Sequence, residues 1–295
     1  MLELKENIMP ESKEFDFLIK LLDDEDEIVY SNVRERFISH GKNTAEFLGR
    51  FLNDENILIK NRATEIITAI NYENITGEIR KILNSGSDSV LEEVMFELAS
   101  FGYPTFNKTL CRQFLDKTAD EIKQRIYLLK EEKTEITSAE ILKIFNGYLF
   151  KEAGFKGTTE DYYNPENSFI NKVIESKTGI PVTLSIVYIL IAKRLKLPVS
   201  GINLPGHFII KYDNGRDQFF IDPYNGGVII SRKEAAEFIN SIGMNDNEFE
   251  NIPYLRTATD KEILLRVIRN LTEIYKKENN NIKAAQLEKL MLGFG

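Results

Sequence analysis

Three similar segments recur at a period of about 30 residues in the first hundred residues of the chain, and this period is typical of stacked helical repeats. They begin at Phe17, Phe47 and Glu78 and read FLIKLLDDEDEIVYSNVRERFISHG, FLGRFLNDENILIKNRATEIITAIN and EIRKILNSGSDSVLEEVMFELASFG. Each combines an apolar helix, a polar turn and a second helix with apolar residues at intervals of three and four. Because one such hairpin cannot bury its own apolar face, the three must stack on one another and on the rest of the chain.

The segments resemble HEAT-like hairpins, and this resemblance implies a binding surface or a structural brace. Residues 1–104 hold 11 basic and 21 acidic residues, whereas the rest of the chain holds 27 and 25. An acidic surface disfavours nucleic acid as a partner. The acidic run Asp23–Glu27 indicates a solvated turn between helices. His40, beside Gly41 at the end of a helix, is expected to cap that helix.

Cysteine and histidine are scarce in this chain, and their scarcity excludes several kinds of site. A single cysteine, Cys111, cannot form an intrachain disulfide or a cysteine-rich metal site. With only two histidines there is no histidine-rich metal centre either, so we expect no cofactor and no metal. Cys111 has apolar neighbours and is expected in the core, with a nucleophilic role as the alternative.

The chain lacks the marks of export or membrane insertion. Its N-terminus, MLELKENIMPESKEF, is charged and has no apolar signal core. The longest apolar stretch, Val182–Ala192, is too short to span a bilayer. We therefore expect a cytoplasmic protein with no membrane partner.

A change of pattern near Pro198 predicts a buried helix followed by a small sheet. The helix is expected over Thr183–Leu195, where only the last residues are charged. Strands are expected over 199–203, 208–212 and 218–221. The turn Asn214-Gly215 joins the last two as a hairpin, which brings His207 and Asp222 to the same end of the sheet.

The strings NPENSFINKVIESKTGIP, LPGHFIIKY and FIDPYNGG carry a family resemblance. In this order they resemble the transglutaminase-like (papain-related) superfamily, and in particular its SirB1 branch, from about Ser138 to Gly227 with a weaker match to the chain end. Together with the repeats, the resemblance implies a mostly helical α+β fold: an α-helical repeat arm, a core with a buried helix and a small antiparallel sheet, and a C-terminal helical hairpin.

The resemblance also suggests three domains. Residues 1–104 would form the HEAT-like repeats, residues 105–255 the transglutaminase-like core, and residues 256–295 a TPR-like hairpin. The hairpin is expected from two amphipathic helices, Asp260–Asn279 and Asn281–Phe294, which should pack on the core.

In that superfamily a cysteine at the start of the buried helix, a histidine and an aspartate form the catalytic trio. By position the histidine corresponds to His207 and the aspartate to Asp222. Counting back about 15 residues from Pro198 for the cysteine gives Val182 or Thr183, and neither is a thiol. Thr183 is a capping or core residue or a weak nucleophile, and Ser185 is the other hydroxyl nearby.

Three kinds of function are compatible with these residues. Whether the chain is an enzyme stays open, with the balance against it. The first is a non-catalytic protein- or peptide-binding or scaffold module, a pseudoenzyme with a retained His207 and Asp222 pair. The alternative is a hydrolase or acyltransferase on amide or peptide bonds, with Thr183 or Ser185 as nucleophile and His207 as base. A third possibility is an interaction protein that works through its acidic repeats. The sequence leaves the oligomeric state open.

Overall fold

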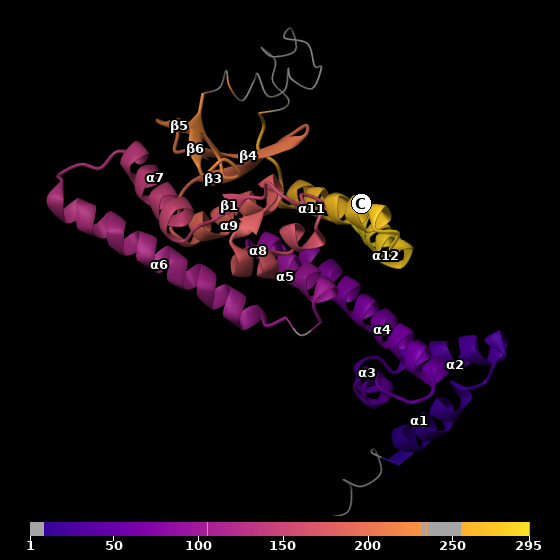
Figure 1. The fold of residues 1–295 in the computed structure, drawn as a ribbon. Helices are drawn as coiled ribbons and strands as arrows, with labels where there is room; N and C mark the ends of the chain where they lie inside the picture. Colours follow the sequence, from indigo (N-terminus) through magenta and orange to yellow (C-terminus); the bar gives the residue numbers. More distant parts are fainter. Residues whose placement is uncertain (1–8, 105, 232–233, 235–254, 295) are drawn as a thin grey trace, which may run out of the picture. The chain divides into compact units, whose positions relative to one another are not determined.

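The computed structural model describes residues 9–104, 106–231, 234 and 255–294. This part of the chain is a mostly helical α+β protein with a small antiparallel sheet, which confirms the predicted fold class (Figure 1). Packing divides the chain into two compact units, Met1–Ile79 and Arg80–Gly295. The three-domain division at residues 104 and 255 stays a prediction.

All the secondary-structure elements described in the first unit are helices. Its elements are α1 (Met9–Leu21), α2 (Glu27–Ser39), α3 (Lys42–Leu48), the 3-10 turn η1 (Gly49–Phe51) and most of α4 (Ile57–Leu83). One apolar core joins them, with buried members from each main helix, for example Phe15, Phe37, Leu48 and Ile66. Asp23–Asp26 of the acidic run form the turn between α1 and α2, and Glu27 begins α2. The Asp26 carboxylate caps α2 by accepting from the Ile28 backbone N–H at 2.7 Å. The interpretation of that run as a turn is confirmed.

The helix α4 corrects one expectation from the repeats. The sequence predicts that the second segment ends in one helix and that the third segment begins with another at Glu78, but a single helix, α4, runs through both. The buried face of α4 continues across the junction, with Ile70, Ile75 and Ile79 all in the core. The junction has no proline, and its single Gly77 costs a helix only about 1 kcal/mol. The second and third segments therefore share one helix, which α5 (Val90–Gly102) follows.

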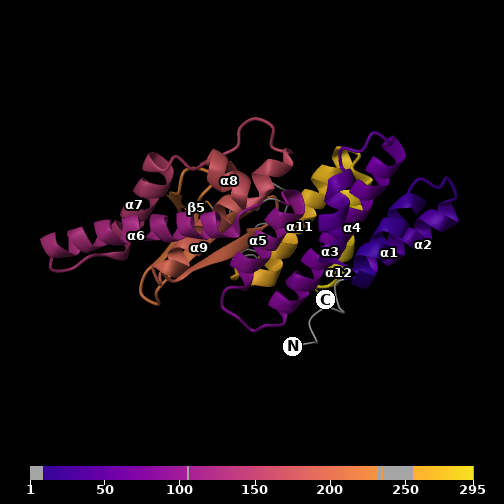
Figure 2. The ribbon, with the colours of Figure 1, turned by 90° about the horizontal axis from the view of Figure 1, so that it is seen from below.

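The second unit is built around α9 (Pro181–Arg194), whose residues 181–192 are all buried. The helix begins two residues earlier than predicted, because Pro181 occupies the first helical position, where its missing N–H costs nothing. It contacts the sheet on one side and α6 (Lys108–Glu132), α8 (Ile170–Ser176) and α11 (Asp260–Lys277) elsewhere (Figure 2). The predicted buried helix is confirmed.

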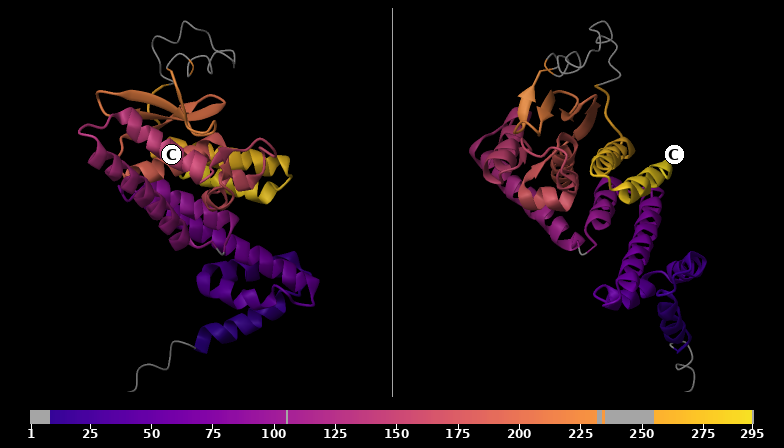
Figure 3. Two further views of the ribbon diagram at one scale, coloured as in Figure 1. Left: turned by 60° about the vertical axis from the view of Figure 1, so that its left-hand side comes forward. Right: turned by 45° about the vertical axis from the view of Figure 1, so that its right-hand side comes forward.

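The sheet has four antiparallel strands in the order β3, β4, β5, β6. They are β3 (Val199–Leu204), β4 (His207–Asp213), β5 (Gln218–Asp222) and β6 (Val228–Ile230). The first three match the predicted strands, whereas β6 was not predicted because it has only three residues. Both views of Figure 3 show these strands as a layer on one side of the helices of this unit. The start of β4 and the end of β5 lie at the same end of this layer.

Short elements and the C-terminal helices complete the second unit. They are α7 (Ser138–Asn146), the π-helical turn η2 (Gly147–Glu152), the 3-10 turn η3 (Pro165–Ser168), the parallel pair β1 (Lys156–Gly157) and β2 (Thr178–Gly179), and α12 (Asn281–Leu292). The helices α11 and α12 pack against each other, and α11 contacts α5, η3, α9 and β3. The predicted C-terminal hairpin that packs on the core is therefore confirmed.

Candidate functional site

His207 and Asp222 meet at one end of the sheet, as predicted. His207 is the first residue of β4 and Asp222 the last of β5, and these strands pair antiparallel. His207 Nε2 and Asp222 Oδ2 lie 2.8 Å apart. Their side chains are 6% and 7% exposed, so the pair is almost entirely removed from solvent. This arrangement holds the imidazole ring in one orientation, as an acid–base group requires.

The turn after β5 completes the hydrogen bonding of the Asp222 carboxylate. Its Oδ1 accepts from the backbone N–H groups of Tyr224 at 3.0 Å and Asn225 at 3.2 Å. Its Oδ2 accepts from Asn225 Nδ2 at 2.8 Å. Burial works to raise the pKa of Asp222, but the hydrogen bond and charge of His207 and the bonds from Asn225 outweigh it, and the pKa is lowered. Asp222 is therefore an ionised, fully bonded partner for His207.

Tyr224 ties this turn to β1. Its ring lies perpendicular to the His207 ring with centroids 6.1 Å apart. Its hydroxyl donates to the Thr158 carbonyl, and the Gly157 N–H donates to its carbonyl at 3.2 Å. A Cβ on Gly157 would lie 2.6 Å from that carbonyl oxygen, so only glycine allows this close approach. Tyr224 was not predicted, because nothing in the local sequence signals its contacts. Asn225 follows Asp222-Pro223 at the spacing of a turn, so its place in the turn could be predicted.

Thr183 and Ser185 lie in the first turns of α9, and both are fully buried. Thr183 is the third helical residue, not the N-cap, because Ile180 is the N-cap and Pro181 begins the helix. The capping interpretation of Thr183 is thus wrong and the core interpretation holds. Neither hydroxyl has a hydrogen-bond partner in the described part of the chain. Neither is therefore bonded to His207, which a nucleophile would need as its base.

Cys111 is a buried residue of α6, 5% exposed. Burial, followed by the negative charge of Glu92, raises the pKa of its thiol to about 12. A thiol with that pKa carries almost no thiolate at neutral pH. The expectation of a core cysteine is confirmed.

His40 belongs to the first unit and caps α2. Its backbone N–H donates to the Phe37 carbonyl at 3.3 Å, and its ring packs perpendicular to Phe15 with centroids 5.2 Å apart. The capping role predicted from its neighbour Gly41 is confirmed.

An arginine that sequence reasoning missed lies at the same sheet end as His207. Arg266, on α11, donates from Nη1 to Asn203 Oδ1 at 2.8 Å and to the Leu204 carbonyl at 3.1 Å. Leu204 pairs with His207 across the β3–β4 hairpin. No local motif signals this contact, because 59 residues separate His207 from Arg266 in the sequence.

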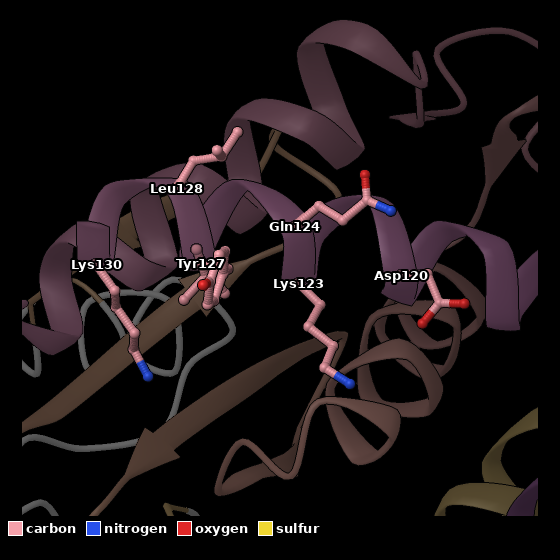
Figure 4. A pocket seen from close by; sticks show the side chains of 7 residues that line it. Asp120, Lys123, Gln124, Tyr127, Leu128 and Lys130 are labelled. Atoms are coloured by element: carbon pink, nitrogen blue, oxygen red, sulfur yellow. The ribbon is translucent and has the colours of Figure 1, made fainter. Parts of the chain in front are cut away.

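Four cavities lined by described residues contain neither His207 nor Asp222 in their walls. One of about 580 Å³ follows α6 and is lined by Asp120, Lys123, Tyr127 and their neighbours (Figure 4). None of the expected site residues lines it. No group of three or more His, Cys, Asp or Glu side chains suited to a metal ion occurs in the described part of the chain. Among the described helices, none combines the length and the apolar character needed to cross a membrane.

Comparisons with known proteins agree with the resemblance seen in the sequence. A family model described as the transglutaminase-like superfamily matches residues 109–269, more than half of the chain. A UPF0162 protein of Xylella fastidiosa (strain 9a5c) is 33% identical over 143 residues, which cover 48% of this chain and 51% of that protein. Human F-box only protein 21 is 28% identical over 148 residues, which cover 48% of this chain and 22% of that protein.

The match thus spans about half the length of the UPF0162 relative and a smaller share of the F-box relative. No solved structure matches the chain. Because the family model covers the buried helix α9, the sheet and both members of the His207–Asp222 pair, the chain belongs to the transglutaminase-like superfamily.

Proposed function

We propose that this chain is a non-catalytic module that binds a protein or peptide beside the His207–Asp222 pair. One observation carries the proposal: the acid–base pair is in place, yet the candidate nucleophiles are not bonded to it. Cys111 is buried with a raised pKa, and both hydroxyls at the start of α9 lack a partner in the described residues. An acid–base pair without an activated nucleophile cannot form a covalent acyl intermediate.

The retained pair still has chemistry suited to binding. Ionised Asp222 fixes the ring of His207 through Nε2. A polar network held in this way keeps the surface beside it in one shape, so a peptide can bind there without first ordering the site. The ligand class is therefore a polypeptide or an amide. Nucleic acid and membrane are not proposed as partners, and a cytoplasmic location stays a prediction.

A second function has one observation in its favour. The Thr183 and Ser185 hydroxyls have no partner in the described residues, and α9, which carries them, packs against β4, which begins with His207. A hydrolase or acyltransferase would need one of these hydroxyls to come within hydrogen-bond reach of the His207 ring. The binding proposal is preferred because a buried alcohol is a far weaker acid than a thiol and needs that contact.

Ring signals of histidine offer a direct test, because the chain has only two histidines. We expect a pool of random peptides to shift the His207 ring signals in a proton–nitrogen NMR spectrum and to leave those of His40 unchanged. His40 is a matched internal control, since it is a helix cap in the first unit. Shifts in neither ring, with peptide binding detected elsewhere or not at all, would contradict the proposal.

A further inference from the structure

Arg266 is a partly buried arginine with no acidic partner in the described part of the chain. Burial and the like charge of Arg269 lower the pKa of Arg266, while the nearby Tyr162 hydroxyl works in the opposite direction. The hydrogen bonds that we find for its guanidinium in the described residues go from Nη1 to two neutral oxygens, Asn203 Oδ1 and the Leu204 carbonyl. Neutral acceptors satisfy donors but do not compensate a charge that has been taken out of water.

Other arginines with limited exposure in this chain are compensated. Arg62 and Arg194 lie 3.2 and 2.7 Å from a carboxylate oxygen. Asp161 precedes Tyr162 in the sequence. Its Oδ2 accepts from Asn164 Nδ2 at 3.0 Å, so this carboxylate is engaged with another residue. Among the described residues Arg266 thus differs from these arginines in lacking a charge partner, so its guanidinium can form a charge-assisted pair with an incoming anion.

Aromatic and cationic side chains near Arg266 form an exposed surface with it. Tyr162 and Tyr163 are 41% and 54% exposed, and their rings meet edge to face at 5.4 Å. Lys277, further along α11, holds its ammonium 3.3 Å from the centroid of the Tyr163 ring. Together with the exposed Arg269, these residues form what we call the α11 patch: Tyr162, Tyr163, Arg266, Arg269 and Lys277.

The α11 patch adjoins the His207 end of the sheet. The Leu204 carbonyl that accepts from Arg266 belongs to the residue paired with His207 across the hairpin. Paired residues on neighbouring strands lie about 5 Å apart between their Cα atoms. A peptide bound beside His207 can therefore place a side chain or its terminus at Arg266.

We propose that Arg266 binds a carboxylate of the peptide ligand of the His207 site, either an acidic side chain or a C-terminal carboxylate. This inference rests on the proposed function. The Nε and Nη2 edge of the guanidinium can grip both oxygens of a carboxylate, and such paired bonds fix orientation as well as charge. Exposed Tyr162 and Tyr163 offer aromatic faces to the residues next to that carboxylate.

The test uses the full chain and four pools of fluorescent random peptides of about eight residues, followed by fluorescence anisotropy. Two pools differ only in a central Glu or Gln, and two differ only in a free or amidated C-terminus. We expect one carboxylate pool to bind about tenfold more tightly than its uncharged counterpart, as for a hydrogen bond between charged groups. The pool that shows this preference identifies the source of the carboxylate.

Variants assign the preference to Arg266. Arg266→Gln should remove the tenfold preference and leave binding of the uncharged pools unchanged, while Arg266→Lys should keep part of it. Arg125→Gln is the matched control, because Arg125 pairs with Glu152 between α6 and η2 and its loss should change nothing. If Arg266→Gln fails to fold, a reduced preference in Arg266→Lys that Arg125→Gln does not show decides in its place.

Two negative results have different meanings. Equal binding of charged and uncharged pools by the wild-type chain, unchanged in Arg266→Gln, would overturn the carboxylate site and leave the proposed function standing. No binding of any pool would overturn both.

Discussion

The His207 end of the sheet and the start of α9 are both buried, but they differ in hydrogen bonding among the described residues. At the sheet end the Asp222 carboxylate accepts four hydrogen bonds, one of them shared with His207. At the start of α9 the hydroxyls of Thr183 and Ser185 have no partner in the described residues. The first region is organised as a polar network, whereas the second is packed as core.

This difference has an energetic meaning. Removal of one member from a satisfied buried network leaves its partners uncompensated and costs several kcal/mol. An unpaired buried hydroxyl is itself a cost, so its removal should be neutral or favourable. The His207–Asp222 network therefore contributes to the stability of the fold. The hydroxyls of Thr183 and Ser185, at the position expected for the nucleophile, do not.

The largest expected effect concerns Cys111, the one thiol that could overturn this contrast by acting as a hidden nucleophile. With its pKa raised to about 12, its thiolate fraction at pH 8 is roughly a thousandfold lower than for an ordinary cysteine. We expect alkylation of the native protein, followed by mass spectrometry, to be slower by about that factor. The same protein in denaturant should react at the normal rate. Rapid labelling without denaturant would show an accessible, activated thiol.

Replacement of the buried acid tests the polar network at the sheet end. Asp222→Ala leaves His207, Tyr224 and Asn225 without their acceptor, and we expect a loss of about 3–5 kcal/mol in the free energy of unfolding. Urea denaturation measures this loss. The control is Asp213→Ala at the exposed end of the same sheet, where Asp213 pairs with Lys211 at 2.8 Å, and its effect should be much smaller. Equal losses would contradict the network.

Acid should weaken the same network. The pKa of Asp222 is lowered in the folded state, so its contribution to stability is complete above the unfolded pKa, near 3.8, and is lost as the pH falls through the folded value. We expect the difference in stability between wild type and Asp222→Asn to shrink below about pH 4. A difference that does not shrink as the pH falls below about 4 would mean that folding does not lower the pKa of Asp222.

The smallest expected effect comes from the start of α9. Thr183→Val removes an unpaired hydroxyl at constant shape and should leave stability unchanged or raise it by up to about 1 kcal/mol. Thr272 is the matched control, because it is also buried but its hydroxyl donates to the Ile268 carbonyl at 2.8 Å. Thr272→Val should lose about 1 kcal/mol in the same denaturation experiment. A loss at Thr183 as large as at Thr272 would indicate a hidden hydrogen bond there.

Sequence patterns were sufficient for the features whose causes are local. The strands β3, β4 and β5 follow from alternation and from the Asn214-Gly215 turn, and their register brings His207 to Asp222. The helix α9 also follows from a continuous apolar run, although the effect of Pro181 on its start was missed, and with it the position of Thr183 within the helix.

The features that were missed depend on contacts between distant residues. The helix α4 continues past Gly77 because its buried face continues, which a search for hairpin repeats does not reveal. The strand β6 is fixed by pairing with β5 more than by its own three residues. Arg266 reaches the His207 end only through the packing of α11 on β3. Long-range packing of this kind has no signature in a single sequence.

The proposed function requires that the His207–Asp222 pair serves binding and not catalysis. The most direct measurement is release of ammonia or amine from peptide carboxamides by the purified full chain, in wild type and in a folded His207→Ala variant. We predict no release above the buffer rate in either protein. Release by wild type that is abolished in His207→Ala, with the fold of the variant confirmed by circular dichroism, would show that the pair is catalytic and contradict the proposal.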